Sequence, residues 1–123
     1  MILVDTSIWV DHLRTTNAAL VRLLGEAGVL AHPFVVGELA LGNLRNRPVV
    51  LESLRQMPRA VLATDDEVLG FIEANGLPGL GVGYIDVHLL ASARLTAGAK
   101  VWTRDQRLAA VAERLDLRAD PAA

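Results

Sequence analysis

The stretch Ile2-Leu3-Val4-Asp5-Thr6-Ser7 places a carboxylate directly after a short apolar run near the N-terminus. Residues 2–4 are apolar throughout rather than alternating with polar residues, which is typical of a parallel strand buried on both faces. Thr6 and Ser7 can cap a helix that begins near Ile8. These residues therefore predict a buried strand that ends at Asp5 and passes directly into a helix.

Beyond this stretch, short apolar runs alternate with segments of helical spacing. The further strand candidates are residues 29–31, 60–62 and 99–103. Apolar spacing, capping residues and glycine stops predict additional helices over residues 18–27, 33–42, 49–56, 64–75, 84–96 and 105–115. Strands that alternate with helices indicate an α/β fold, with a short, mainly parallel sheet of about four strands covered by helices on both faces.

The composition is that of one domain over residues 1–123, because a chain of this length can bury a single hydrophobic core. Its 52% of apolar residues exceeds the usual range, so we expect an oligomer or partner interface. The net charge of −2 gives no overall attraction to nucleic acid, but eleven of the twelve basic residues are arginines, which suit phosphate contacts. There is no cysteine and no apolar run near the roughly 18 residues of a membrane span, so we expect a cytoplasmic protein.

Four carboxylates fall at the predicted strand ends or on helices that can face those ends. They are Asp5, Glu38, Asp86 and Asp105. In an open parallel sheet, sites form beyond the carboxyl ends of the strands. Mg²⁺ takes oxygen ligands, so convergence of these side chains would create a site for a hard divalent cation.

Each of these acids also has a simpler interpretation. Asp5 and Asp105 can cap the helices that follow them. Asp86 can be a favourable charge in the first turn of its helix. Glu38 lies among apolar residues, and because a buried unpaired carboxylate is costly, we expect a metal or an arginine beside it.

Four motifs in this chain together point to a known family. They are Val4-Asp5-Thr6-Ser7, Gly37-Glu38-Leu39, Gly83-Tyr84-Ile85-Asp86 followed by Leu89-Leu90-Ala91-Ser92-Ala93, and Trp102-Thr103-Arg104-Asp105. In order and spacing they resemble the PIN-domain ribonucleases, and most closely the VapC-type toxins of toxin–antitoxin pairs. The likeness covers essentially the whole chain and implies a PIN-domain-like three-layer α/β/α sandwich.

The resemblance also implies a chemistry, namely hydrolysis of RNA phosphodiester bonds with Mg²⁺ or Mn²⁺. By this likeness Asp5 and Asp86 are the main metal ligands, and Glu38 and Asp105 complete the catalytic set. The hydroxyl residues Thr6 and Thr103 are then expected to orient the ligands or a water molecule. Five arginines are candidates for contacts with RNA phosphates around these acids: Arg14, Arg45, Arg47, Arg104 and Arg107.

A toxin of this type implies a VapB-type antitoxin as partner, RNA as substrate and a homodimer. We expect the antitoxin groove near residues 33–44 and 49–56, with Val36, Leu41 and Leu54 as candidate contacts. The alternative from a different class is a catalytically silent PIN-fold module that only binds a partner. A metal-dependent phosphatase of the haloacid dehalogenase type is less favoured, because it needs a second aspartate where this chain has Ser7.

Overall fold

Three short parallel strands form the centre of the computed structural model, which describes residues 1–121. The strands are β1 (Ile2–Val4), β2 (Val29–Leu30) and β3 (Lys100–Trp102). Their order is β2-β1-β3, with Ile2 opposite both Val29 and Lys100. The N-terminal strand is therefore central, and all three strands end at the same edge of the sheet.

The prediction of a fourth strand at residues 60–62 is wrong, because these residues form no strand. Only a parallel bridge between Ala31 and Arg59 remains beside β2, where the amide of Ala60 donates to the carbonyl of Ala31 at 3.0 Å. The next amide, that of Val61, donates instead to the Thr96 hydroxyl at 2.8 Å. This side-chain acceptor diverts the backbone from strand pairing, so three strands are formed where about four were expected.

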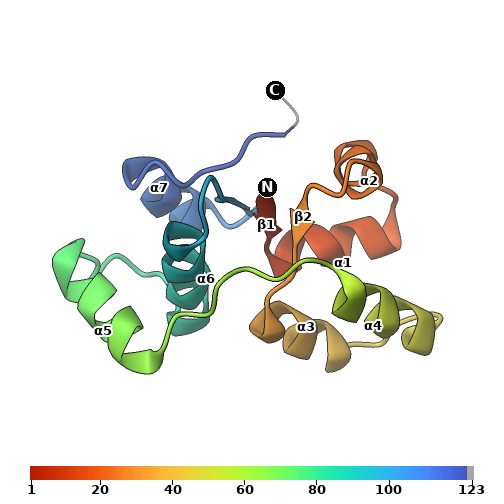
Figure 1. Ribbon diagram of the computed structural model, residues 1–123, viewed down its shortest axis with the longest axis horizontal. Helices are drawn as coiled ribbons and strands as arrows, with labels where there is room; N and C mark the ends of the chain where they lie inside the picture. Colours follow the sequence, from red (N-terminus) through yellow and green to blue (C-terminus); the bar gives the residue numbers. More distant parts are fainter. Residues whose placement is uncertain (122–123) are drawn as a thin grey trace.

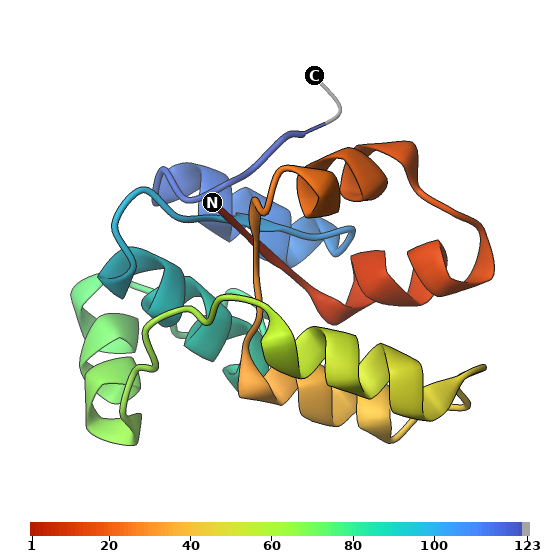
Figure 2. The same ribbon diagram turned by 45° about the vertical axis from the view of Figure 1, so that its right-hand side comes forward.

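Seven helices surround the strands within residues 1–121. They are α1 (Thr6–Arg14), α2 (Ala18–Gly25), α3 (Pro33–Ala40), α4 (Arg47–Gln56), α5 (Asp65–Ala74), α6 (Tyr84–Leu95) and α7 (Gln106–Arg114). Figure 1 shows β1 and β2 at the centre, with α5 and α6 on one side and α1 to α4 on the other. In Figure 2, α2 (orange) lies above the strands, and α3 (light orange) and α4 (yellow-green) lie below them, which gives the three layers expected from the sequence.

Five of the seven helices in residues 1–121 begin at residues whose side chains accept backbone N–H groups, the exceptions being α4 and α6. Asp5 caps α1, Thr64 caps α5 in a complete capping box with Glu67, and Asp105 caps α7. Such caps typically contribute about 1 kcal/mol each to stability. Two of the candidate site acids are thus also fixed by their capping role. No helix in the described part of the chain is long and apolar enough to span a membrane.

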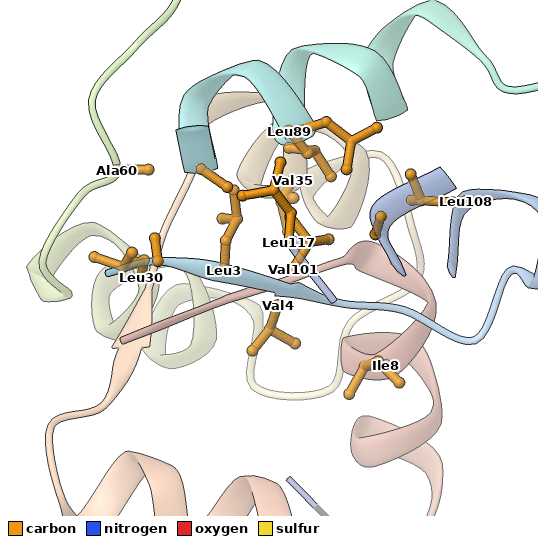
Figure 3. Close-up of a cluster of buried hydrophobic side chains, with 14 of the residues drawn as sticks. Leu3, Val4, Ile8, Leu30, Val35, Ala60, Leu89, Val101, Leu108 and Leu117 are labelled. Carbon is orange, nitrogen blue, oxygen red and sulfur yellow. The ribbon is translucent and has the colours of Figure 1, made fainter. Parts of the chain in front are cut away.

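The core packs against both faces of β1. Leu3 and Val4 are fully buried and, as neighbours on a strand, point to opposite faces of the sheet. Figure 3 shows Leu3 on the side of Leu89 from α6, and Val4 on the side of Ile8 from α1. Burial of each such side chain contributes roughly 1.5–3 kcal/mol, so the apolar run that precedes Asp5 anchors that residue firmly in the fold.

Candidate active site

The candidate site lies at the edge where β1 and β3 end. Asp5 directly follows β1, and its amide donates to the carbonyl of Trp102, the last residue of β3, at 2.9 Å. Thr103 directly follows β3. This hydrogen bond continues the parallel pairing by one residue, so it places Asp5 beside Thr103 and near Asp105.

Asp5 is held by hydrogen bonds to both of its carboxylate oxygens. Its Oδ1 accepts the Thr6 amide at 2.8 Å, and its Oδ2 accepts the hydroxyls of Ser7 at 2.9 Å and Thr103 at 2.7 Å. The residue is only 6% exposed, so these bonds offset the cost of burying the charge. A carboxylate has about four lone-pair positions, and three donors therefore leave room for one further ligand.

Ser7 is the site residue that sequence reasoning missed, because it was interpreted only as a helix cap. Its hydroxyl donates to Asp5 Oδ2 and accepts the amide of Arg104 at 3.1 Å. It also lies 3.4 Å from the hydroxyl of Thr103. Ser7 thus joins the start of α1 to the turn after β3, and the signal was the hydroxyl residue two positions after Asp5.

Glu38 approaches from α3 and is linked to the strand edge through Thr6. The Thr6 hydroxyl donates to Glu38 Oε1 at 2.7 Å. The expectation that Glu38 is buried is wrong, because this side of α3 lines an open cavity and the residue is exposed. Because Glu38 is exposed, the cost of burying an unpaired charge no longer argues for a metal or an arginine beside it. The hydrogen bond from Thr6 instead supports a role for Glu38 in the site.

Asp86 lies in the first turn of α6 and is half-buried. Burial, together with the charges of Asp5, Asp105 and Glu38, raises the pKa of Asp86 from 3.8 to about 6, although a hydrogen bond with the Gly83 backbone acts in the opposite direction. Three separate segments therefore bring negative charge close enough to Asp86 to oppose its ionisation. The four acids expected to meet do share one electrostatic environment.

Asp105 caps α7, as the sequence predicts, and is also linked to Asp5. Its Oδ1 accepts the Leu108 amide at 3.0 Å and caps α7. Its own amide donates to the Thr103 hydroxyl at 3.0 Å, and that hydroxyl in turn donates to Asp5. Thr103 therefore connects Asp5 with Asp105, although Asp105 itself is exposed.

The donor set fits a hard divalent cation. It consists of carboxylate oxygens, the ligands that Mg²⁺ and Mn²⁺ accept, and its excess negative charge is evident in the raised pKa of Asp86. Within residues 1–121, however, no three carboxylate, histidine or cysteine side chains are already gathered closely enough to hold a metal ion. The four acids lie near one another but do not converge on one position. This is expected, because the carboxylates repel one another and are held by separate hydrogen bonds.

Comparison with known proteins identifies the family. The sequence profile of the PIN domain matches residues 2–114. This chain belongs to the PIN domain family. Two relatives, each named Ribonuclease VapC32, come from the CDC 1551 / Oshkosh and ATCC 25618 / H37Rv strains of Mycobacterium tuberculosis. Each is 49% identical to this chain over 110 residues, which cover 89% of this chain and 89% of the relative. The resemblance to VapC-type PIN domains is thereby confirmed.

The arginines of this PIN domain differ in how firmly they are held. Arg104 forms an ion pair with Asp11. Arg47 donates to the backbone carbonyls of Ala40 and Gly42. The side chain of Arg107 lies against Gly81, which has a φ of +78° and where a Cβ atom would fall 2.8 Å from the guanidinium. These three guanidinium groups therefore have structural contacts within the protein.

The histidines have structural surroundings rather than a place among the four acids. His12 accepts the Asn17 amide at 3.0 Å. His32 caps α3 by accepting the Phe34 amide, and burial lowers the pKa of this imidazole to about 4. His88 is buried, and its ring packs edge-to-face against Phe34. No histidine is needed to explain the site.

Proposed function

We propose that this chain is a divalent-metal-dependent endoribonuclease that acts as the toxin of a type II toxin–antitoxin pair. Two relatives that match most of the chain are named ribonucleases. The single observation that carries the proposal is the set of four carboxylates around the end of β1, in which the charges of the other three oppose the ionisation of Asp86. A fold alone does not imply a function, so this site is the necessary support.

In this proposal Asp5 and Asp86 are the principal metal ligands, with Glu38 and Asp105 completing the set. A bound Mg²⁺ or Mn²⁺ supplies an activated water and counter-charge for the leaving oxygen of the phosphodiester. Asp5 contributes a carboxylate whose orientation is fixed in advance, because both of its oxygens accept hydrogen bonds. Pre-orientation matters because it lowers the cost of arranging the reacting groups.

The hydroxyl residues around these acids hold the ligands in position. Thr103 and Ser7 restrain Asp5, and Thr6 restrains Glu38. Groups that hydrogen-bond to metal ligands typically change metal affinity or activity by 10–100-fold when removed. Ser7 therefore joins Thr6 and Thr103 in the proposed supporting set.

The proposal is tested by cleavage of RNA by the purified, partner-free protein. We expect cleavage with Mg²⁺ or Mn²⁺, none with EDTA, and cleavage on the order of a thousand-fold slower with Asp5→Asn. Asp66→Asn is the matched control, because Asp66 is an exposed acid in the first turn of α5 and is not among the groups that shift Asp86. If wild-type protein cleaves no RNA with any divalent ion, a silent partner-binding module becomes the better description.

We also propose a VapB-type antitoxin as partner, bound near α3 and α4. Leu41, just after α3, is 90% exposed and suits an apolar contact, and Val36 is partly buried. Leu54 was a wrong candidate, because it faces the core from α4 and is only 3% exposed. A toxin–antitoxin pair implies that the antitoxin is encoded by an adjoining gene. We expect Leu41→Asp to weaken capture of the protein encoded by that gene, while Leu69→Asp on α5 leaves capture unchanged.

A homodimer is the remaining partner proposal. Several large apolar side chains are exposed on the chain, including Val61 at 50% and Leu62 at 49%. Such exposure favours a protein–protein contact. Light scattering of the purified protein would show twice the 13.2 kDa mass of the chain if the proposal is right, and the monomer mass if it is wrong.

A further inference from the structure

A cavity of about 390 Å³ opens directly beside Glu38. It lies between α1 and the segment that runs from α3 toward α4. Its apolar wall includes Val10, Leu13 and Leu44, and two arginines, Arg14 and Arg45, also line it. A cavity of this size holds one small ligand, on the order of a drug-sized molecule. The cavity therefore joins one acid of the candidate site to a mixed apolar and cationic surface.

The face of α1 toward this cavity forms a continuous stripe that begins at the four acids. Thr6, Val10 and Arg14 recur at four-residue intervals, so they lie above one another on the helix. Thr6 is bound to Glu38 at the inner end of the stripe, and Arg14 lines the cavity at the outer end. Eight residues of helix separate them by about 12 Å. A ligand that extends outward from the acids along α1 would therefore contact the apolar side chain of Val10 first and the guanidinium of Arg14 next.

Arg14 and Arg45 are less restrained than the other candidate phosphate contacts, of which Arg107 packs its side chain against Gly81. Arg104 is paired with Asp11, and Arg47 is hydrogen-bonded to backbone carbonyls. Arg14 and Arg45 make neither an ion pair nor a side-chain hydrogen bond with other residues in the range 1–121, although Glu38 lines the same cavity. Both guanidinium groups are exposed and keep all of their donors for a ligand.

The turn that carries Arg45 is itself held in place. Arg47 donates to the carbonyls of Ala40 and Gly42, which closes the segment between α3 and α4. Arg45 therefore projects from a restrained turn rather than from a free loop. Restraint before binding lowers the ordering cost of the contact.

We infer that this cavity binds one nucleotide of single-stranded RNA next to the scissile bond, with Arg14 and Arg45 on its phosphates and the apolar wall against its base or ribose. Single-stranded RNA is bound through unstacked bases and through backbone phosphates, which matches one apolar wall and two free arginines. The inference rests on the proposed function, because the acids beside Glu38 mark the position of the scissile phosphate.

Charge favours RNA over a basic protein segment as the occupant. A polyanion can satisfy both guanidinium groups at once, with two donors toward each phosphate. A partner segment that carries a basic side chain toward Glu38 would have to pass two unpaired positive charges on the same cavity. The overall charge of −2 gives no general affinity for RNA, so the contact must come from this local pair.

The test measures binding of a short fluorescein-labelled single-stranded RNA to the cleavage-deficient Asp5→Asn protein by anisotropy over a range of salt concentrations. Arg14→Gln and Arg45→Gln are each made in this background. We expect each to weaken binding about ten-fold and to reduce the slope of log Kd against log salt by about 0.7. Arg55→Gln is the matched control, because it removes one exposed positive charge from α4 that does not line the cavity.

Cleavage by otherwise wild-type protein separates this inference from the proposed function. We expect Arg14→Gln and Arg45→Gln to raise KM for RNA about ten-fold more than Arg55→Gln does. If wild type cleaves RNA and the two variants match the Arg55→Gln control in both KM and anisotropy, the cavity inference is wrong and the nuclease function stands. If wild type cleaves nothing but Asp5→Asn protein binds RNA through both arginines, the nuclease proposal fails and the binding site stands.

Binding of the proposed antitoxin to the arginine variants tests whether the cavity is instead occupied by a protein. Capture of the protein encoded by the adjoining gene is expected to survive both arginine substitutions. Loss of that capture with unchanged RNA binding would overturn the inference and assign the cavity to a protein partner.

Discussion

Asp5 and Asp105 occupy corresponding places in this molecule, since each lies just past a parallel strand and each caps the next helix. Their surroundings differ sharply. Asp5 follows the central strand, is 6% exposed and accepts three hydrogen bonds. Asp105 follows an edge strand, is exposed and accepts one. The same local pattern in the sequence thus produces a buried carboxylate held by three hydrogen bonds and an exposed one held by a single hydrogen bond, and the position of the strand in the sheet makes the difference.

The largest effect that can test this contrast is on RNA cleavage. Asp5→Asn keeps the size of the side chain but removes its charge, and we expect kcat to fall on the order of a thousand-fold, as for loss of a fixed electrostatic group. Asp105→Asn should cost roughly ten-fold to a hundred-fold, as for a group that tunes a metal site. If single-turnover assays show equal losses of cleavage rate for the two variants, the greater burial of Asp5 does not make it more important for cleavage than Asp105.

The hydroxyl that joins the two aspartates gives the next effect. Thr103→Val keeps the shape of the side chain but removes the donor to Asp5 and the acceptor of the Asp105 amide. We expect a 10–100-fold weaker apparent Mg²⁺ affinity, measured as the Mg²⁺ dependence of cleavage. Thr96→Val, which breaks the hydroxyl contact with Val61 away from the acids, is the control and should leave the Mg²⁺ dependence unchanged.

The capping role of Asp105 can be separated from its charge by urea unfolding. Asp105→Ala removes the acceptor for the Leu108 amide and should lower the free energy of unfolding by about 0.5–2 kcal/mol. Asp105→Asn retains an oxygen at that position and should unfold close to wild type. If the alanine variant is as stable as wild type, the cap contributes nothing and Asp105 is held only by the site.

The pH dependence of the free energy of unfolding tests whether the neighbouring carboxylates repel the charge of Asp86. The pKa of Asp86 is raised from 3.8 to about 6 in the folded protein, so between these values the folded state binds more protons and its stability falls as pH rises. His32 acts in the opposite direction, because its pKa is lowered from 6.5 to about 4. The comparison with Asp86→Asn isolates the first effect.

We expect Asp86→Asn to gain stability relative to wild type as the pH rises from 4 to 6, and to keep that advantage at pH 7 in EDTA. Chemical denaturation at several pH values measures this difference. A difference that does not change with pH would mean that the neighbouring acids do not oppose the ionisation of Asp86.

The central strand and the acid that follows it, Asp5, could be predicted from the sequence because both are local features. An unbroken apolar run predicts a buried strand, and the residue after it must lie at the sheet edge. Four short motifs then identified Asp86, Glu38 and Asp105 through a family resemblance. Local pattern and family likeness were sufficient to name the four acids.

The parts that failed depend on long-range contacts. Glu38 was expected to be buried, but the side of α3 that carries it lines an open cavity. Leu54 was expected on a partner surface, but α4 turns it into the core. Ser7 was interpreted as a cap because its bonds to Thr103 and Arg104 span more than 90 residues. None of these three outcomes is set by neighbours in the sequence.

The most direct test of the central claim is metal binding in the absence of RNA, measured by Mn²⁺ electron paramagnetic resonance with Mg²⁺ as competitor. The claim is that Asp5 organises one divalent-metal site from the four acids. We predict that wild-type protein binds Mn²⁺ and releases it to Mg²⁺, that Asp5→Asn loses this binding, and that the exposed control Asp66→Asn keeps it. Unchanged Mn²⁺ binding by Asp5→Asn would contradict the account.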